Sequence, residues 1–420
     1  MIVPSGTGET VLELFPAGSY VDPDGQLVVG GNRLSDLADT YGTPAYLVDE
    51  FALRQQVNSF RTELTSRWPN SLVCFASKAF PCTAAYALMA EEGIGVDVAG
   101  AGELVLALRA GVHPSKIVLH GNAKTTEELS LAVQAGIGLI VVDNLDDIAR
   151  LDELVTGEQA VLVRVVPGVQ PDTHEAISTG QHGSKFGLET AAAQQAIAML
   201  RKHKRLRLDG VHMHIGSQVM ATEPFAEAVR ALAGFGEFDV YDLGGGLGAR
   251  YTRADQLPSV GAWVGTLVDA AREHLPAQAK LLIEPGRAMV AESGLTLYRV
   301  VSVKDGFVAV DGGMGDNLEV SLYGQPFEAV VANRAGAEPN RRVELVGRHC
   351  ESGDRLIADA WLAEPAVGDL IAVPVTGAYC YTMSNNYNGN RRPPVVFLDR
   401  GTARLVVRRE TFEDLTRRDV

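Results

Sequence analysis

The chain is poor in the features that mark membrane, secreted and nucleic-acid-binding proteins. Its 420 residues include only four cysteines and 6% aromatic residues. Acidic residues outnumber basic ones by 52 to 37, so the net charge of -15 argues against non-specific nucleic-acid binding. No apolar run approaches the roughly 20 residues that a membrane-spanning helix needs. We therefore expect neither a membrane nor a nucleic-acid partner.

The few cysteines also limit the possible cross-links and metals. Cys74, Cys82, Cys350 and Cys380 form no CxxC pair, and no histidine cluster accompanies them at zinc-ligand spacing. Residues 1–13 lack the basic start and apolar stretch of a secretory signal. We expect a cytoplasmic protein with reduced thiols and no bound metal.

The composition is that of a globular protein with a large core. Hydrophobic residues make up 46% of the chain and charged residues 21%. From residue 45 to 300, short β-branched runs alternate with amphipathic stretches such as Thr83–Glu92. This alternation predicts a parallel sheet, and eight such units predict a closed (β/α)8 barrel of the TIM type. The predicted strands are Leu72–Ala76, Ile94–Val98, Lys116–His120, Leu139–Asp143, Val161–Val166, Gly210–His214, Val240–Leu243 and Leu281–Glu284.

The texture changes after about residue 300. Strand-like runs such as Phe307–Val310 and Leu370–Val375 follow one another with turns between them and little helix. This pattern predicts a β-sandwich or β-barrel domain, which the strand-like Gln26–Val29 would join. The predicted domains are therefore a barrel over residues 45–300 and a β domain over residues 1–44 and 301–420.

Lys78 stands out because it ends the first predicted barrel strand, after Cys74–Ala76, with no acid beside it. An ammonium there is costly to bury unless it faces a cavity or is used covalently. It suits an amine that forms a Schiff base with an aldehyde cofactor. The alternative is a lysine whose ammonium extends to solvent.

Two further strand ends carry groups that suit a phosphorylated ligand. Gly244, Gly245 and Gly246 follow Asp242, and glycines let backbone N–H groups approach a phosphate closely. A flexible turn is the alternative. Glu284 precedes Gly286 and Arg287 and could hold a protonated ring nitrogen, while Arg287 could bind an anion. An internal Glu284–Arg287 ion pair is the alternative.

The segment His212–Gln218 places two histidines on one side of a strand. His214 could stack on an aromatic cofactor, and Ser217 could donate a hydrogen bond to a phosphate. A satisfied core histidine is the alternative, which suits His212 better. No carboxylate lies at metal-ligand spacing, so we expect no metal.

The β domain contains two polar segments. In His349–Asp354, Cys350 lies among polar residues, where its thiol could donate a proton and Glu351 could bind a cationic group. The segments Gly377–Tyr381 and Asn385–Asn388 are rich in tyrosine and asparagine. Their composition suits a polar binding surface, and a turn with a solvated rim is the alternative.

Together these segments resemble the fold-type III pyridoxal-phosphate decarboxylases, from about Leu34 to Leu415. Five motifs occur in the family's order, and Gly377–Tyr379 is a sixth; the five are Phe75–Ala79, His214–Gln218, Gly244–Gly246, Glu284–Arg287 and Cys350–Asp354. Each motif is weak alone, but five in order are specific. The resemblance implies the alanine-racemase-like combination of a barrel and a C-terminal β domain.

The resemblance also implies residue roles. Lys78 would bind pyridoxal 5'-phosphate covalently, His214 would stack on its ring, and Glu284 would pair with the ring nitrogen. Cys350 would protonate the product carbon across a homodimer with shared active sites. The phosphate contacts would be Ser217, Gly244, Gly245, Gly246, Gly286 and Arg287, with Tyr379 nearby. The substrate contacts would be Arg287, Tyr323, Glu351 and Tyr379.

The implied reaction is the decarboxylation of meso-2,6-diaminopimelate to L-lysine and carbon dioxide, the last step of lysine biosynthesis. One departure matters, because Glu319 stands where the family usually has an arginine before Leu322–Tyr323. It motivates an alternative, a related decarboxylase acting on another free or carrier-bound amino acid. A racemase would not need Cys350 and Glu351, and a cofactor carrier would not need the second domain.

Overall fold

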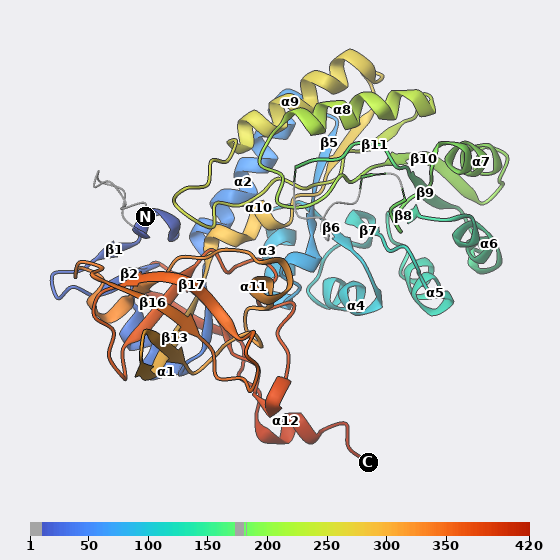
Figure 1. Ribbon diagram of the computed structural model, residues 1–420. Coiled ribbons are helices and arrows are strands. Elements are labelled where there is room, and N and C mark those ends of the chain that lie inside the picture. Colours follow the sequence, from blue (N-terminus) through green and yellow to red (C-terminus); the bar gives the residue numbers. More distant parts are fainter. Residues whose placement is uncertain (1–10, 173–179, 182) are drawn as a thin grey trace. The chain divides into compact units, whose positions relative to one another are not determined.

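The computed structural model describes residues 11–172, 180–181 and 183–420 (Figure 1). The chain forms two compact units. One unit comprises Arg54–Gly248 and Leu257–Met289, and the other comprises the described part of Met1–Leu53 with Ala249–Gln256 and Val290–Val420. Residues 1–10 of the predicted β domain lie outside the described residues.

The first unit is a closed barrel of eight parallel strands in the order β10-β11-β12-β5-β6-β7-β8-β9. The prediction of a (β/α)8 barrel is therefore confirmed, and each of the eight predicted runs contributes a strand. The strands are β5 (Ser71–Ala76), β6 (Gly95–Val98), β7 (Ile117–Leu119), β8 (Leu139–Val142), β9 (Gln159–Arg164), β10 (Leu206–His212), β11 (Val240–Asp242) and β12 (Lys280–Ile283).

Alternate residues of these strands fill the barrel interior. Cys74, Val118, Val141, Leu162 and Leu282 form one buried cluster, together with Val240. The register sets Ala76 opposite Asp97 and His212 opposite Asp242, so the carboxyl ends of neighbouring strands lie at one level. The loops that follow the strands consequently meet at one end of the barrel.

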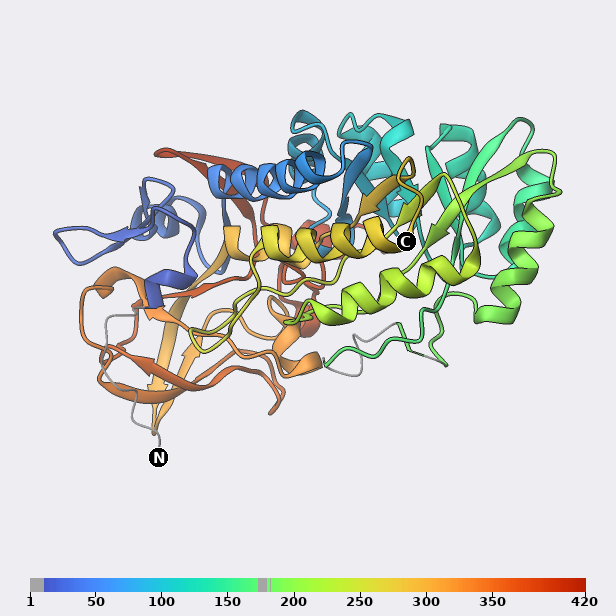
Figure 2. The same ribbon diagram turned by 90° about the horizontal axis from the view of Figure 1, so that it is seen from above.

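Helices alternate with the strands along the chain and cover them on the outside (Figure 1). In Figure 2, α8 and α9 run side by side, and their residues are in contact. None of the described helices combines the length and the apolar character that crossing a membrane requires. The helices are α2 (Glu50–Arg67), α3 (Thr83–Glu91), α4 (Ala101–Arg109), α5 (Thr126–Ala135), α6 (Leu145–Leu154), α7 (Thr190–Leu200), α8 (Glu223–Leu232) and α9 (Val260–His274).

The limits of α5 illustrate how the sequence sets these helices. Thr125 accepts a hydrogen bond from the Glu128 backbone, and the Glu128 side chain accepts one from Thr125, which forms a capping box. Gly136 ends the helix in the left-handed conformation at φ 64°. The helix therefore begins and ends where local sequence requires it.

The second unit is built on a nine-stranded mixed sheet and a three-stranded antiparallel sheet, β1-β2-β3. The main path of the large sheet is β17-β16-β14-β13-β4-β19-β20, and β18 pairs with β13 and β15. The small sheet comprises β1 (Tyr20–Val21), β2 (Leu27–Val29) and β3 (Asn32–Arg33). The large sheet comprises β4 (Ala45–Asp49), β13 (Gly294–Lys304), β14 (Phe307–Val310), β15 (Val330–Val331), β16 (Arg341–Val346), β17 (Arg355–Leu362), β18 (Leu370–Pro374), β19 (Val395–Asp399) and β20 (Thr402–Val407).

One hydrophobic core joins the two sheets of this unit. Leu27 and Val29 of the small sheet share a cluster with Leu47, Leu297 and Val396 of the large one, and α1 (Leu34–Tyr41) packs there as well. The strand β4 falls inside residues 45–300 but pairs with β13 and β19. All five of its residues are buried. A continuous apolar run does not reveal which of two sheets it joins, and this accounts for the difference from the predicted limit.

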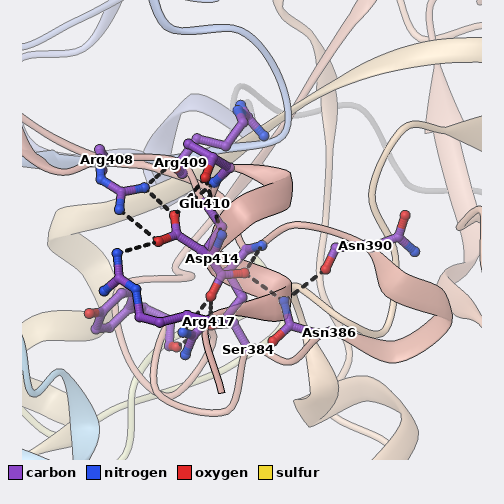
Figure 3. Close-up of polar contacts among 11 residues, drawn as sticks. Ser384, Asn386, Asn390, Arg408, Arg409, Glu410, Asp414 and Arg417 are labelled. Carbon is purple, nitrogen blue, oxygen red and sulfur yellow. Dashed lines mark hydrogen bonds and ion pairs between the residues drawn. The ribbon is translucent and has the colours of Figure 1, made fainter. Parts of the chain in front are cut away.

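The C-terminal segment is held by a network of ion pairs and hydrogen bonds, shown in Figure 3. Asp414, in α12 (Phe412–Thr416), pairs with Arg408 and Arg417, and the Arg408 guanidinium is the main reason why the pKa of Asp414 is lowered. Glu410 accepts hydrogen bonds from Asn386 at 2.6 Å and from Arg392 at 2.7 Å. The network ties the chain end to the predicted polar segment around Asn386.

Gly210 in β10 lies at a point of very close backbone contact with β11. A Cβ at this position would lie 1.7 Å from the carbonyl oxygen of Val240 in β11. We predict that Gly210→Ala lowers the free energy of unfolding by about 3 kcal/mol or more, because the strand must move away from its partner. The measurement is urea unfolding followed by circular dichroism.

Gly102 in α4 supplies the matched control. Apart from its chain neighbours and the backbone of its own helix, no atom of the described residues lies within 4 Å of the position that its Cβ would take. Gly102→Ala should be neutral or stabilise by up to about 1 kcal/mol, since alanine favours helix. A Gly210→Ala protein as stable as the Gly102→Ala protein would contradict the close packing of β10 on β11.

Candidate active site

The single-turn helix Ser77–Ala79 after β5 presents Lys78 at the strand ends of the barrel. Lys78 is exposed between the buried Ser77 and Ala79, and its ammonium makes no hydrogen bond or ion pair with any described residue. Its charge contributes, after burial, to the lowered pKa of His214. The amine is therefore accessible and lies among the polar groups of the strand ends.

Glu284 follows β12 and is only 4% exposed. Its Oε1 lies 2.7 Å from His120 Nε2, and its Oε2 lies 3.3 Å from His212 Nε2. Burial, followed by the nearby charge of Asp97, raises the pKa of Glu284 to about 8. Such a carboxyl group ionises more readily when a cation or a hydrogen-bond donor approaches it.

His214 lies just beyond β10, and its ring is held from the neighbouring loop. The backbone N–H of Gly245 donates a hydrogen bond to His214 Nδ1 at 3.2 Å. Burial and then Lys78 lower the pKa of His214 well below its usual value, so the imidazole is neutral near pH 7. A neutral, fixed imidazole can stack on an aromatic ring.

The glycines after β11 are required by close backbone contact. Gly244 has φ 64° and Gly246 has φ 123°, which other L-residues rarely adopt. A Cβ on Gly245 would lie 2.0 Å from the Glu284 carbonyl oxygen, and one on Gly246 would lie 2.5 Å from the Gly216 oxygen. Three strand-end loops thus converge as bare backbone, an arrangement that suits an anion.

Arg287 and Ser217 complete this set in the barrel unit. Arg287 is 4% exposed, and its Nε donates a hydrogen bond to Ser217 Oγ at 3.1 Å. Gly286 comes close to the first strand, since its Cβ would lie 3.0 Å from that of Ala76. The contact with Ser217 orients the guanidinium of Arg287 within the set of strand-end groups.

The loop between β16 and β17 carries Cys350 and Glu351 in the other unit. Both are exposed, whereas the His349 beside them is buried. His349 Nδ1 lies 2.9 Å from Asp354 Oδ2, and its ring stacks on Tyr387 with centroids 5.6 Å apart. The buried histidine anchors a loop whose next two side chains reach solvent.

The predicted polar surface at Asn385–Asn388 has a supporting role in this unit. Asn388 Oδ1 accepts a hydrogen bond from the Cys350 backbone N–H at 2.8 Å, and Tyr387 OH lies 3.5 Å from Glu351 Oε2. Asn386 in turn donates to Glu410 (Figure 3). The C-terminal segment therefore helps to hold the Cys350 loop.

Three further predicted residues lie in the same unit. Tyr379 is partly buried and has φ 64°, a strained value for a bulky residue. Tyr323 ends α11 (Leu318–Tyr323), and Gly324 follows at φ 63°. Glu319 is 0% exposed, and its Oε2 accepts a hydrogen bond from Tyr251 OH at 3.2 Å. Glu319 is thus turned inward rather than toward solvent.

The structure divides the predicted residues between the two units. The barrel unit brings together Lys78, His214, Ser217, Gly244, Gly245, Gly246, Glu284, Gly286 and Arg287. Tyr323, Cys350, Glu351 and Tyr379 belong to the β-sheet unit. Reasoning from the sequence assigned no role to Asp242 or His120, which adjoin Glu284. The signal for both was present, because each polar residue ends an apolar strand.

Comparison with known proteins gives a consistent family. Residues 51–291 match the family described as "Pyridoxal-dependent decarboxylase, pyridoxal binding domain". The chain is 43% identical to a diaminopimelate decarboxylase of Actinosynnema pretiosum subsp. auranticum, over 99% of this chain and 97% of the relative. It is 42% identical to the diaminopimelate decarboxylase of Bacillus subtilis, over 94% and 95% of the two chains.

Solved structures agree with these relatives. The diaminopimelate decarboxylase of M. jannaschii in complex with L-lysine superposes with a TM-score of 0.90 at 31% identity, over 96% of this chain and 98% of that one. The Helicobacter pylori enzyme with L-lysine gives 0.86 at 30% identity, over 91% and 98%.

The different burial of the four thiols leads to a prediction. Cys74, Cys82 and Cys380 are buried, and Cys350 is exposed. An aromatic disulfide reagent should modify one thiol per native chain rapidly and the others only on unfolding, because access limits the reaction. Cys350→Ser should remove the fast phase, and Cys82→Ser should leave it unchanged. A fast phase that survives Cys350→Ser would contradict the exposed loop.

Proposed function

The chain belongs to the diaminopimelate decarboxylases, a group of pyridoxal-dependent decarboxylases, and we propose that its barrel residues hold the cofactor while its Cys350 loop completes the active site. The enzyme is a carboxy-lyase that converts meso-diaminopimelate to L-lysine and carbon dioxide, the last step of lysine biosynthesis. One observation carries the division of roles: an accessible Lys78 lies at the same strand ends as the buried Glu284.

The strand-end groups fit pyridoxal phosphate. Lys78 offers an amine for the aldehyde, His214 offers a neutral ring for stacking, and Glu284 offers a buried carboxyl group for the ring nitrogen. When bound, the cofactor withdraws the electron pair left behind by the departing carboxyl group. A cation opposite Glu284 lowers its pKa, so the carboxylate and the ring proton stabilise each other.

The bare backbone beside His214 fits the phosphate group. We assign this role to Gly244, Gly245 and Gly246, with Ser217 and the backbone of Gly286 and Arg287. The support is the convergence of three loops at glycines that leave no room for a side chain. Tyr379 is assigned near the phosphate by its motif.

The substrate contacts are assigned to Arg287, Tyr323, Glu351 and Tyr379. Arg287 can bind a carboxylate, and the exposed Glu351 can bind an ammonium group. Cys350 delivers the proton to the carbon that has lost its carboxyl group. The hydrogen bond from its backbone to Asn388 and the anchoring of His349 hold its loop for that task.

Glu319 does not redirect this assignment. The named relatives support diaminopimelate as substrate and do not support another amino acid. Within its unit, the Glu319 carboxylate accepts a hydrogen bond from Tyr251, so it has an internal partner. The Glu319 side chain therefore has a structural role that is independent of the substrate.

We propose that the enzyme works as a cytoplasmic homodimer in which the Cys350 loop of one protomer serves the barrel of the other. The support is that the predicted residues fall into two sets on different compact units. A symmetric dimer would give each site one set from each protomer.

The function is tested by product analysis with purified enzyme loaded with cofactor. Carbon dioxide and L-lysine should form from meso-diaminopimelate, and L-lysine, L-ornithine and L-arginine should release little carbon dioxide, because they lack the second carboxylate that Arg287 can bind. Faster release from one of the three basic amino acids would refute the substrate.

The shared site is tested by mixing two inactive variants. Lys78→Ala should lose the cofactor linkage, and Cys350→Ala should keep the cofactor spectrum but lose at least about 100-fold in turnover as its proton donor is removed. If protomers exchange randomly, half of the mixed dimers carry one intact site, and activity should return to about a quarter of wild type.

The matched control is a mixture of Lys78→Ala with a Lys78→Ala, Cys350→Ala double variant. This mixture has no protomer with an intact Lys78 and should stay inactive. Absence of recovery in the first mixture, with exchange verified by native mass spectrometry, would contradict sharing of sites between protomers.

A further inference from the structure

Four polar side chains are buried together at the carboxyl ends of β7, β10, β11 and β12. They are His120, His212, Asp242 and Glu284. One ring nitrogen of each histidine and one carboxyl oxygen of each acid lie within 4.8 Å of one another. The rings of His120 and His212 are 4.6 Å apart and meet edge to face. Asp242 is 0% exposed and Glu284 is 4% exposed. Because these four titratable side chains are buried together, their protonation states must leave few charges and few polar atoms without a partner.

The contact between the two acids fixes one of these protonation states. One carboxyl oxygen of Asp242 and one of Glu284 lie within 4.8 Å of each other, and Asp242 Oδ2 has no hydrogen-bond partner among the described residues, so a hydrogen bond between the two acids would satisfy it. Ionised carboxylates are acceptors only, so the bond forms only if one acid is protonated. Two buried carboxylates side by side also repel each other strongly, which disfavours the doubly ionised state.

The neighbours decide which acid keeps the proton. Glu284 lies against two imidazoles, at 2.7 Å from His120 and 3.3 Å from His212. Asp242 Oδ1 accepts one backbone N–H, from Gly244 at 3.0 Å, and Oδ2 accepts no hydrogen bond from a described donor. Glu284 therefore has a side-chain donor in His120 and a second imidazole close by, whereas Asp242 has one backbone donor, so the charged form of Glu284 is the better stabilised.

We propose that Asp242 is a positioning residue that stays protonated and donates its O–H to Glu284, so that Glu284 meets the cofactor's ring nitrogen as a carboxylate. This inference deepens the proposed function and rests on the role assigned there to Glu284. Asp242 itself acts through Glu284. Burial raises the pKa of Asp242 well above its usual value and that of Glu284 to about 8, and the nearby Asp242 side chain offsets part of the rise at Glu284.

His120 acts as a neutral donor in this arrangement, whereas the His212 ring makes no hydrogen bond with a described residue. Burial lowers the pKa of both His120 and His212, so neither is an imidazolium near pH 7. His120 donates from Nε2 to Glu284 Oε1. The charged and titratable groups that also act on the cluster are Asp97, whose Oδ1 lies 3.8 Å from His120 Nε2, and Arg164, Lys78, His214 and Cys74.

Protonated Asp242 would be a hydrogen-bond donor to Glu284, whereas ionised Asp242 would be a second anion near the ring nitrogen. If Asp242 were ionised, it would help to keep the ring nitrogen protonated by its charge. If it is protonated, it helps only by holding Glu284 in the ionised state. An amide in place of Asp242 retains a donor and cannot carry a charge. Asp242→Asn should therefore leave the pKa of the ring nitrogen nearly unchanged if Asp242 is protonated, and should lower it if Asp242 is ionised.

The test uses holoenzyme variants reconstituted with pyridoxal phosphate that carries an isotope label at the ring nitrogen. NMR reports the protonation of that nitrogen as a function of pH. Asp242→Asn should keep its pKa within about half a unit of wild type, because the amide still donates to Glu284. Asp242→Leu should lower it by about one unit or more, since Glu284 then retains its own proton to higher pH.

The equilibrium constant for cofactor release gives a second readout. Asp242→Leu should weaken cofactor binding by roughly 10-fold or more, and Asp242→Asn by less than about 3-fold. An equal decrease in the pKa of the ring nitrogen in Asp242→Asn and Asp242→Leu would overturn the inference, because it would show that the charge of Asp242 mattered. A wild-type value in both variants would overturn it as well.

His120 provides an independent pair should the Asp242 variants fold poorly. His120→Gln keeps an N–H donor, and His120→Leu removes it. The neutral-donor arrangement predicts that Gln keeps the ring nitrogen's pKa close to wild type and that Leu lowers it. If Gln is as damaging as Leu, the histidine contributes something other than a hydrogen bond, and the proton assignment is wrong.

Glu284→Gln distinguishes failure of the inference from failure of the proposed function. This variant should lower the ring nitrogen's pKa more than any other, because it removes the carboxylate itself. An unchanged ring nitrogen in Glu284→Gln would refute the role assigned to Glu284. A changed ring nitrogen in Glu284→Gln, with equal behaviour of the two Asp242 variants, would refute only the inference about Asp242.

Discussion

Burial of carboxyl groups at the strand ends is the constraint on which the barrel's chemistry depends. Glu284 is removed from water and meets the imidazoles of His120, after β7, and His212, at the end of β10. A buried charge without partners would cost several kcal/mol, so the strands must bring donors to it in fixed positions. The closed parallel barrel does this, because the carboxyl ends of β7, β10, β11 and β12 bring His120, His212, Asp242 and Glu284 together. Fold and protonation are therefore linked: a shift of one strand would separate the acids from their donors.

The same strand ends must also leave room for a ligand, which explains why glycine and charge occur together there. Gly245 lies so close to the Glu284 carbonyl that no side chain fits. The β-sheet unit has a different requirement, because the loop that carries the exposed Cys350 must be held in one conformation. Asp354 and Asn388 bind that loop through the His349 and Cys350 backbones at 2.7 and 2.8 Å. Each unit thus stabilises its own set of side chains by its own contacts.

Much of this arrangement could be predicted from the sequence. The eight barrel strands were found because buried parallel strands form short β-branched runs, and their ends were marked by polar residues such as His120. The limits of the units were harder to predict, since β4 is apolar throughout and its pairing with β13 is set by tertiary contacts. Asp242 and Glu284 follow different strands, so the approach of their carboxyl oxygens to within 4.8 Å of each other is seen only in the structure.

Glu319 shows most clearly why residue type alone is a poor guide to specificity. Judged by residue type alone, an acid in place of an arginine suggests a changed preference for substrate charge. In the structure, the side chain is 0% exposed and accepts a hydrogen bond from Tyr251, which lies in a segment that belongs to the same unit. A buried carboxylate must first satisfy its own neighbours, and removing such a partner is costly. Its identity can therefore be selected by the packing of the unit, whatever the substrate carries.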